Sequence, residues 1–525
     1  MIADRPEQQR LAAGQPGSRI LLASNRGPVS FEVGPDGAPR ASRGSGGVVT
    51  ALASLGGLRP ITWIACAMSE GDRRAAQLGV PIETPAPGLD ARLVTLDRQV
   101  YRKYYETISS RVLWFIQHYM WNTIYGPSLD RVSYDAWETG YVPANEMLAR
   151  TVLESADDAA PTVMVQDYHL YLVPGIIRRL APGATIQHFT HIPWPEPRYW
   201  RLLPFEWRTE ICAALAACDI VGFQTRRDVM NFLASCEDFL VGSEVDYVRS
   251  EVWLGDRRVH VRAYPISVDP ARVRQVAAGS AARRHAQRLA AEPGVRTILR
   301  VDRLEPSKNI LRGFDAFAQL LERRPDLRGR VRFLAFLVPS RETVPEYRRY
   351  RAAVFERVDA INRRFGNPIQ IGYEHNYPLA LAAMSLYDVL LVNPLIDGMN
   401  LVAKEGPIVN ERSGVLVLSE GAGAHVQLKG GAVSIPAADL EATTQALEHA
   451  LEMGQAEREA RAALLHEAIV RHDLDWWLER QLADLAQLRR GAMPGGAPTR
   501  EPGLLQLEQD DLEEDLTRRP VAPPT

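Results

Sequence analysis

The chain alternates short apolar runs with helix-length segments, and this alternation starts twice. In the first half the strand-like runs lie at 19–24, 161–167, 184–192, 219–225 and 259–265. After the segment YPISVDP (264–270) they resume at 297–303, 331–337, 368–373, 388–394, 414–420 and 432–436. Strands that alternate with helices are typical of a parallel sheet covered on both faces. The pattern therefore predicts an α/β protein with two Rossmann-like domains.

The same pattern predicts the domain boundaries. We expect a first domain over 19–265, a second over 266–470, and a helix at 471–490 that crosses back to the first. Residues 1–18 and 491–525 are polar, and the second segment contains the acidic run LEQDDLEEDL, so we expect disordered tails. Ligands of such sheets bind beyond the carboxyl ends of the strands, and two facing domains leave a cleft between them.

Charge and composition exclude several classes of protein. The 525 residues carry 61 basic and 64 acidic side chains, so electrostatics gives no reason to bind nucleic acid or an anionic membrane. There is no long uncharged apolar run and no apolar signal-peptide core at the N-terminus. The cysteines, Cys66, Cys212, Cys218 and Cys236, lack the spacing of a disulfide framework or zinc site. We expect a cytoplasmic protein without metal or cofactor, and leave open whether it forms a homo-oligomer.

Lysine is scarce in this chain. Only Lys103, Lys308, Lys404 and Lys429 occur among the 61 basic residues. Where arginine fills most positions that need only positive charge, a remaining lysine indicates a position that needs a compact ammonium group. The alternative is that these lysines remain by chance.

Glycine and arginine follow the first predicted strand. SNRGP (24–28) contains Arg26, and RGSGGVV (43–49) contains Gly47. Such glycines let the backbone approach a phosphate and direct N–H groups at it, and Arg26 supplies a fixed positive charge. The alternative for the glycine loop is a plain turn.

A second basic turn follows the first strand of the second half. In RVDRLEPSKN (300–309), Arg303 and Lys308 stand on either side of a strand-to-helix turn. Their charges and the N-terminus of the next helix favour binding of a diphosphate. The alternative is a solvated surface pair.

A third turn, in NPLIDGMNLVAKEG, also follows a strand. Asp397 opens it, and Asn400, Leu401 and Val402 are expected to start a helix whose free N–H groups meet phosphate. Glu405 lies where a carboxylate accepts hydrogen bonds from two ribose hydroxyls. The alternative for Asp397 is a helix N-cap.

Three further segments offer sugar-binding side chains. VQDYHL and HFTHIP carry Asp167 and His191 at strand ends, where both types are also common as structural residues. YRKYYETISSRVLW carries Tyr105 and Trp114, which either belong to the helix core or present polar tips and flat faces to a carbohydrate. Arg341 follows the second strand of the second half.

Together these motifs resemble the trehalose-6-phosphate synthases, a GT-B family of retaining glucosyltransferases. The motif order is kept from about residue 19 to residue 490, and DGMNLVAKE stands without a change. The resemblance implies two Rossmann-like domains, no metal, and two substrates: a nucleotide sugar, most readily UDP-glucose, and glucose 6-phosphate.

The resemblance also implies roles for individual residues. For the acceptor, Arg26 and Arg341 hold the phosphate, Tyr105, Trp114 and Trp63 complete the site, and Asp167 meets the sugar. For the donor, the implied residues are Gly47, Arg303, Lys308, Asn400, Leu401, Val402 and Glu405. His191, Asp397, Arg303 and Lys308 are implied to be catalytic.

Two segments depart from the family pattern. The usual RLDYxKG reads RLEPSKN, so Glu305, Pro306 and Asn309 replace an aspartate, a tyrosine and a glycine. GPIVNERSG after the AKE motif also resembles the pseudo-glycosyltransferase that makes validoxylamine phosphate. Two alternatives therefore stay open: transfer to glycerol 3-phosphate or a cyclitol phosphate, and a non-catalytic sugar-phosphate sensor. The sensor predicts loss of the donor motifs, which are present.

Overall fold

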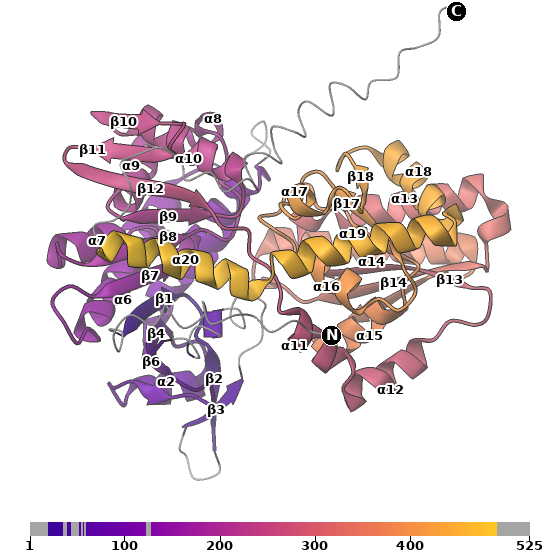
Figure 1. Cartoon of the computed structure of the whole chain (residues 1–525), viewed down its shortest axis with the longest axis horizontal. Helices are drawn as coiled ribbons and strands as arrows, with labels where there is room; N and C mark the ends of the chain where they lie inside the picture. The colour runs from indigo at the N-terminus through magenta and orange to yellow at the C-terminus, as the bar shows by residue number, and fades with distance from the viewer. Residues whose placement is uncertain are drawn as a thin grey trace, which may run out of the picture. The chain divides into compact units, whose positions relative to one another are not determined.

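The computed structural model describes residues 19–34, 39–43, 52–53, 56, 59–121 and 128–490. These residues form a ten-stranded sheet, a six-stranded sheet and a separate two-stranded hairpin. We call the part of the chain with the ten-stranded sheet the N-terminal lobe and the part with the six-stranded sheet the C-terminal lobe (Figure 1). The prediction of two Rossmann-like halves is confirmed.

The sheet of the N-terminal lobe has the order β10-β11-β12-β9-β8-β7-β1-β4-β6-β5. Its strands are β1 (Ile20–Ser24), β4 (Ile61–Cys66), β5 (Ile82–Glu83), β6 (Leu89–Val94), β7 (Thr162–Gln166), β8 (Thr185–Phe189), β9 (Ile220–Phe223), β10 (Ser243–Asp246), β11 (Glu251–Leu254) and β12 (Arg257–Ala263), and the hairpin is β2 (Val29–Val33) with β3 (Pro39–Arg43). Strands β1, β4 and β7 are buried at every position, as expected for parallel strands covered on both faces.

The strands predicted in this half, β1, β7, β8, β9 and β12, pair in parallel as expected, and the edges of the sheet add antiparallel strands that were not predicted. Strands β10, β11 and β12 pair antiparallel, and so do β5 and β6. The connections at 247–250 and 255–256 are too short for the crossover that parallel strands need, so they form hairpins. The strands β4, β5, β6, β10 and β11 were not predicted from the sequence.

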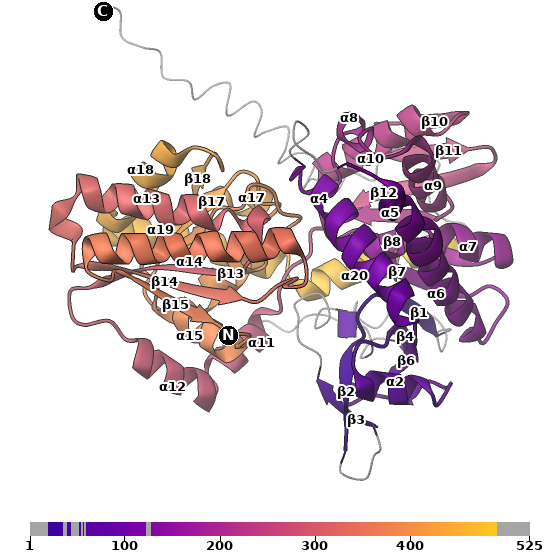
Figure 2. The ribbon, with the colours of Figure 1, turned by 180° about the vertical axis from the view of Figure 1, so that it is seen from behind.

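Helices cover both faces of the sheet in the N-terminal lobe. They are α2 (Glu70–Ala76), α3 (Arg98–Tyr101), η3 (Arg102–Leu113), α4 (Trp114–Gln117), α5 (Arg131–Ala136), η4 (Trp137–Tyr141), α6 (Val142–Glu154), η5 (Tyr168–Leu170), α7 (Val173–Leu180), α8 (Pro197–Trp200), α9 (Phe205–Leu215) and α10 (Arg226–Phe239). Figure 2 shows α4, α5 and α6 in front of the strands on the face opposite to that seen in Figure 1. The segment η3 is a π-helix, in which the Trp114 N–H donates to the Ser109 carbonyl five residues earlier.

The six strands of the C-terminal lobe are all parallel, in the order β15-β14-β13-β16-β17-β18. They are β13 (Arg296–Arg303), β14 (Val331–Val338), β15 (Ile369–Tyr373), β16 (Val389–Val392), β17 (Val415–Ser419) and β18 (Val433–Ile435). The helices are α11 (Pro270–Ala277), α12 (Ser280–Leu289), η6 (Pro306–Lys308), α13 (Ile310–Arg323), η7 (Pro325–Leu327), α14 (Pro345–Phe365), α15 (Tyr377–Leu386), α16 (Val402–Val409), α17 (His425–Leu428), α18 (Leu440–Glu452), α19 (Gln455–Arg471) and α20 (Leu474–Arg489).

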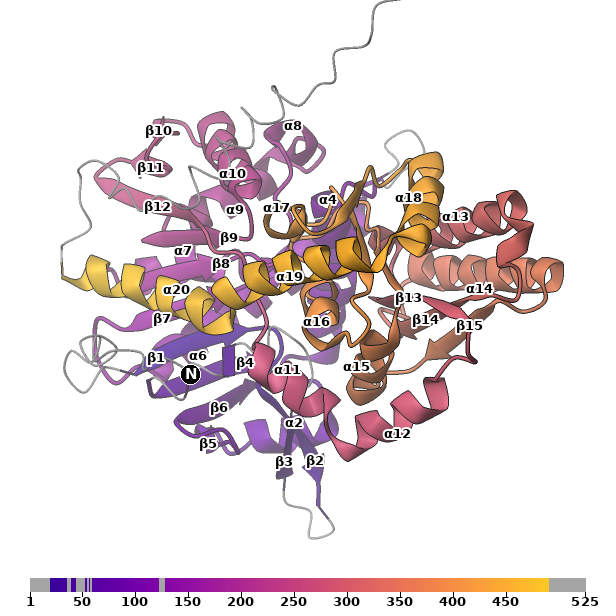
Figure 3. The same cartoon turned by 45° about the vertical axis from the view of Figure 1, so that its right-hand side comes forward.

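Each face of the six-stranded sheet has its own group of helices. Helix α13 contacts α14 and α18, whereas α16 contacts α15 and α19. Figure 3 shows α15, α16 and α19 together on one face, and Figure 2 shows α13 and α14 on the other. Ile310, Phe314, Phe317 and Leu320 form an apolar stripe of α13 that is buried in the core of this lobe.

In each lobe the chain adds strands first on one side of a central strand and then on its other side. In the N-terminal lobe β1 is followed on one side by β4 and on the other by β7, and in the C-terminal lobe β13 lies between β14 and β16. Crevices at such switch points, beyond the carboxyl ends of the strands, are where ligands bind in open α/β sheets. Of the predicted site residues, Arg26, Asp167, Arg341 and Asp397 follow β1, β7, β14 and β16, and Arg303 is the last residue of β13.

Two segments connect the lobes. Ile266, in the linker after β12, donates its N–H to Gln224 of the N-terminal lobe at 2.9 Å and accepts a hydrogen bond from Lys404 of α16 at 2.8 Å. Helix α20 returns to the first sheet, where the Trp477 indole donates to the Tyr264 carbonyl at 3.0 Å. No helix among the described residues combines the length and apolar character that a membrane span requires.

Candidate active site

The turn after β13 places Arg303 and Lys308 beyond the end of the C-terminal sheet. Strand β13 ends at Arg303, and Lys308 is the last residue of η6. The Arg303 side chain is 47% exposed, whereas that of Lys308 is 10% exposed. One basic group is therefore open to solvent and the other is largely enclosed.

A buried arginine holds this turn in place. Arg300 is fully buried and donates from Nη2 to the Lys308 carbonyl at 2.9 Å and to Asn393 Oδ1 at 2.6 Å. Asn393 directly follows β16, so Arg300 ties the turn to the neighbouring strand end. Sequence reasoning missed Arg300, although a charged residue inside the apolar run TILRV was a usable signal.

Lys308 forms an ion pair with Asp397, in the turn after β16. Asp397 Oδ2 also accepts a hydrogen bond from Asn400 Nδ2 at 3.1 Å. Burial alone raises the pKa of Asp397, but the charge and hydrogen bond of Lys308 outweigh it, and the pKa is lowered. Helix α16 starts at Val402, with Leu401 before it, so their N–H groups precede the first hydrogen-bonded turn, as expected for a phosphate-binding helix start.

Glu405 lies in the first turn of α16 and accepts a hydrogen bond from the Tyr377 hydroxyl at 2.9 Å. Burial raises the pKa of Glu405 to about 7, although the Tyr377 hydrogen bond acts in the opposite direction. A carboxylate in this position accepts hydrogen bonds from vicinal hydroxyls when it is ionised. Tyr377 is a further candidate that sequence reasoning did not single out.

Arg341 connects the C-terminal lobe to the aromatic segment of the N-terminal lobe. Its guanidinium carbon lies 3.9 Å from the ring centroid of Trp114, and its Nη2 donates to the Tyr168 hydroxyl at 3.1 Å. The guanidinium carbon of Arg303 lies 5.3 Å from the same Trp114 ring. Two arginines from different strand ends therefore meet on one indole face, a favourable cation–π arrangement.

Arg26 and Tyr105 approach this cluster from the N-terminal lobe. Arg26 follows β1 and is exposed, and the Tyr105 ring is stacked with that of His169 at a centroid distance of 5.8 Å. Burial lowers the pKa of His169 well below its usual value, and the charges of Arg341 and Arg26 lower it further. Both guanidinium groups are thus within electrostatic reach of one imidazole.

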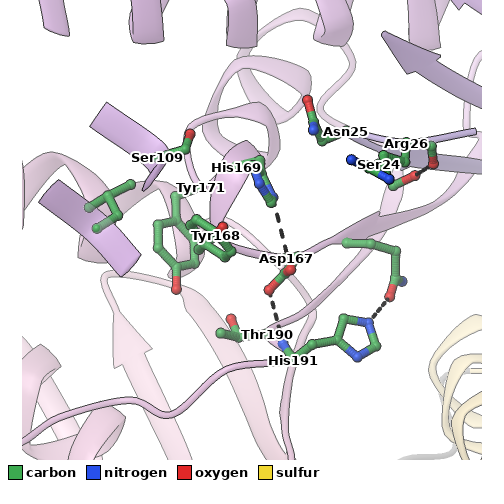
Figure 4. Close-up of polar contacts among 12 residues, drawn as sticks. Ser24, Asn25, Arg26, Ser109, Asp167, Tyr168, His169, Tyr171, Thr190 and His191 are labelled. Carbon is green, nitrogen blue, oxygen red and sulfur yellow. Dashed lines mark hydrogen bonds and ion pairs between the residues drawn. The ribbon is translucent and has the colours of Figure 1, made fainter. Parts of the chain in front are cut away.

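Asp167 follows β7 and lies between two histidines. Figure 4 shows its carboxylate between the His169 ring and the main chain of His191, whose N–H donates to Oδ1 at 3.2 Å. Burial raises the pKa of Asp167 to about 6, against the opposing effect of its hydrogen bonds and of the charges of Arg303 and Arg341. The group therefore changes charge close to neutral pH.

His191 is held by two amide side chains. Its Nε2 lies 2.9 Å from Gln166 Oε1 and its Nδ1 lies 3.4 Å from Gln224 Nε2. Burial lowers the pKa of His191 to about 3, so the ring is neutral at pH 7. A neutral imidazole is not a general acid at neutral pH, so the ring acts here only as a hydrogen-bonding group.

The main chain of His191 packs against the turn that carries Asp397. A Cβ added to Gly398 would lie 2.1 Å from the His191 carbonyl oxygen, so only glycine allows this approach. The HIP and DGMN motifs, which are about 200 residues apart in the sequence, are thereby in direct contact.

Two predicted residues are not part of this arrangement. Trp63 is 1% exposed within β4 and its indole donates to Ser24 Oγ at 2.7 Å, so it is a core residue and does not line the site. Its apolar neighbours in TWIAC already favoured a strand core. Gly47 lies outside the described residues.

The backbone of the candidate site is strained. Four of its non-glycine residues, Asp167, Asn309, Arg341 and Asn400, have positive φ angles of 73°, 57°, 43° and 76°. Such conformations persist only where the surroundings impose them, and they are frequent in active sites. Among the residues that the structure describes, no group of three or more His, Cys, Asp or Glu side chains is placed to hold a metal ion.

Comparison with known proteins identifies the family. The glycosyltransferase family 20 profile matches residues 18–487. A trehalose-6-phosphate synthase of Mycobacterium sp. (strain KMS) is 36% identical over 508 residues, covering 92% of this chain and 99% of the relative. A validamine 7-phosphate valienyltransferase of Streptomyces hygroscopicus subsp. jinggangensis is 31% identical over 480 residues, covering 90% and 95%.

Two solved structures share the fold. One, described as trehalose-6-phosphate from E. coli bound with UDP-2-fluoro glucose, has a TM-score of 0.78 at 27% identity and covers 90% of this chain and 99% of its own. The other, an α,α-trehalose-phosphate synthase (UDP-forming) from Burkholderia xenovorans in complex with glucose-6-phosphate, has a TM-score of 0.74 at 27% identity, covering 90% and 100%. These matches confirm the predicted GT-B fold. The chain belongs to glycosyltransferase family 20 and is a glycosyltransferase.

Proposed function

We propose that this enzyme is an α,α-trehalose-phosphate synthase. It transfers glucose from UDP-glucose to O1 of glucose 6-phosphate with retention of configuration, and releases UDP. The names of its relatives and the ligands of the two structural neighbours support this substrate pair. Because nucleotide sugars and hexose phosphates are metabolites of the cytoplasm, the proposal includes a cytoplasmic location.

The observation that carries the proposal is that Arg303 and Arg341, at the ends of different strands, both lie against the Trp114 ring; we call this pair of arginines the substrate junction. Both guanidinium groups contact the Trp114 ring, at 5.3 and 3.9 Å. We assign Arg341, with Arg26, to the acceptor phosphate, and Arg303, with Lys308, to the donor diphosphate. Charge-assisted hydrogen bonds of this kind each contribute about 1.5–3 kcal/mol, so the site favours two phosphorylated ligands.

Catalysis in this proposal is mainly electrostatic. As the bond between C1 of glucose and the diphosphate breaks, negative charge grows on the leaving oxygen, where Arg303, Lys308 and the first N–H groups of α16 stabilise it. The acceptor hydroxyl forms the new bond to C1 on the same face and passes its proton to that leaving oxygen. Neutral His191 and ionised Asp397 and Asp167 orient the hydroxyl groups of the two sugars.

A second candidate keeps the donor and changes the acceptor to a cyclitol phosphate or glycerol 3-phosphate. The 31% identity to a valienyltransferase and the departures around Glu305 favour keeping this alternative. Arg26 and Arg341 bind the acceptor phosphate in either case, so these residues do not distinguish between the two acceptors.

One assay separates them. UDP-, ADP- and GDP-glucose are each combined with glucose 6-phosphate, glycerol 3-phosphate and a cyclitol phosphate, and released nucleoside diphosphate is measured. NMR of the product gives its anomeric configuration. We expect the highest kcat/KM with UDP-glucose and glucose 6-phosphate and an α,α-linked product. A higher kcat/KM with another acceptor contradicts the proposal, and binding without release with every pair indicates a sensor.

A further inference from the structure

Glu305 is a buried carboxylate that contacts both arginines of the substrate junction. Its side chain is fully buried, and its Oε1 lies 2.7 Å from Arg341 Nη1 and 3.1 Å from Arg303 Nη1. The same oxygen accepts a hydrogen bond from Ser340 Oγ at 2.6 Å. Glu305 Oε2 is also buried and has no hydrogen-bond partner among the described residues.

The two arginines need such a partner. Their like charges lie on one Trp114 ring and repel each other, and Glu305 is the carboxylate that forms an ion pair with both of them. A single carboxylate between two guanidinium groups replaces this repulsion with two attractions. It also sets the orientation of each guanidinium plane, because the N–H groups of a guanidinium lie in one plane and donate hydrogen bonds along fixed directions.

Glu305 remains charged despite its burial. Desolvation alone raises the pKa of the Glu305 carboxyl, but the charges of Arg303 and Arg341 and the Ser340 hydrogen bond lower it to about 2. A buried carboxylate is costly unless it is paired and hydrogen-bonded, and the pairing here meets that requirement.

We propose that Glu305 is a positioning residue. It fixes the guanidinium group of Arg341, assigned to the acceptor phosphate, relative to that of Arg303, assigned to the donor diphosphate. This inference rests on the proposed function, which assigns Arg341 and Arg303 to different substrates. Glu305 itself touches neither substrate. Its loss is therefore expected to weaken binding of both phosphorylated ligands at once, although each arginine is still present.

The test compares Glu305→Gln, which removes the charge at nearly constant size, with the wild type. Calorimetry measures the affinities for UDP and for glucose 6-phosphate, and kinetics measures kcat and both KM values. We expect both affinities to fall by about tenfold to a hundredfold, the size of a lost charge-assisted contact. Glu305→Asp keeps the charge and is expected to recover a large part of both.

Glu342→Gln is the matched control. Glu342 lies in the loop after β14, next to Arg341 in the sequence, but its side chain is 52% exposed and pairs with Arg351 at 3.1 Å. We expect its affinities for UDP and glucose 6-phosphate to stay within twofold of the wild type.

Double-mutant cycles distinguish positioning from general stabilisation. If Glu305 acts through Arg341, Glu305→Gln has little further effect on the affinity for glucose 6-phosphate in an Arg341→Ala background. If it acts through Arg303, Glu305→Gln has little further effect on the affinity for UDP in an Arg303→Ala background. Additive effects in both cycles, or unchanged affinities in Glu305→Gln, overturn the inference. Wild-type protein that binds neither ligand and forms no product instead overturns the proposed function. Should Glu305→Gln not fold, Ser340→Ala, which removes the hydrogen bond that orients Glu305 Oε1, replaces it in the cycles and is expected to lower both affinities in the same direction.

Discussion

Lys308 and Asp397, which are 89 residues apart in the chain, form an ion pair between the ends of two neighbouring strands. Both side chains are largely enclosed, so the pair orders the ammonium group before any substrate binds. The cation assigned to the diphosphate is thus held by the carboxylate assigned to the donor sugar. Orientation before binding reduces the reorganisation needed when charge develops on the leaving group.

Replacing Lys308 with alanine is expected to lower kcat by at least 10²–10³, the cost of losing one donor to a developing anion. The fold should remain, with a lower melting temperature, because Asp397 is left as a buried charge without its partner. Steady-state kinetics and thermal unfolding measure the two effects. Lys103→Ala serves as the control, since Lys103 pairs with Asp135 away from this turn and should keep full activity. An active Lys308→Ala enzyme would remove Lys308 from the mechanism.

The two arginines assigned to the acceptor phosphate should differ in their effect on stability. Arg26→Ala and Arg341→Ala are each expected to raise the KM for glucose 6-phosphate at least tenfold. Arg26 is exposed, so its loss should leave the melting temperature nearly unchanged. Arg341→Ala leaves buried Glu305 without one of its partners and should cost about 3 kcal/mol or more of unfolding free energy. Equal melting temperatures for the two variants would contradict this placement of Arg341.

Activity should fall on the acid side of pH 6. The pKa of Asp167 is raised to about 6, so its carboxylate is lost as the pH falls through that value, and kcat/KM for the acceptor should fall with it. The acceptor phosphate titrates in the same range, with a second pKa of about 6. Asp167→Asn separates the two causes, because only the substrate's contribution to the acid limb remains in that variant. An unchanged pH profile in Asp167→Asn excludes Asp167 as its origin.

The raised pKa of Asp167 also predicts a change in stability. The pKa of the Asp167 carboxyl is raised to about 6 in the folded protein from its ordinary value of 3.8, so the contribution of Asp167 to stability falls as the pH rises from 3.8 to 6. At pH 7 the ionised form is therefore destabilising, and Asp167→Asn should melt at a higher temperature than the wild type while being less active. Denaturation followed at pH 4 and pH 7 tests the sign, because the gain should be present only at pH 7.

Gly398→Ala tests the contact between the HIP and DGMN motifs. The added methyl group would lie 2.1 Å from the His191 carbonyl oxygen, so one of the two turns must move. Because 1 Å of misplacement near the reacting groups is costly, we expect kcat to fall about a hundredfold. Gly430→Ala is the matched control, since its Cβ would meet no atom within 4 Å. Similar kcat values for both variants would show that the contact is not required.

Much of the site was predictable from sequence because its residues follow strands. Arg26, Asp167, Arg303 and Asp397 stand after short apolar runs, and the carboxyl ends of parallel strands meet at one edge of a sheet. Trp63 was predicted at the acceptor site, whereas it lies within β4 with a side chain that faces the core. Local spacing carries no information on that direction.

The sequence alone determined the parallel strands of both sheets, the turns that carry charge, and the family to which those turns are similar, since each depends on residues that are neighbours in the chain. Only the tertiary structure decided which charges are paired. Glu305 and Arg341 are 36 residues apart and Lys308 and Asp397 are 89 apart, and Arg300 is hidden inside a strand. Contacts of this kind arise when separate strand ends pack together, and their strength depends on burial, which no local pattern of residues records.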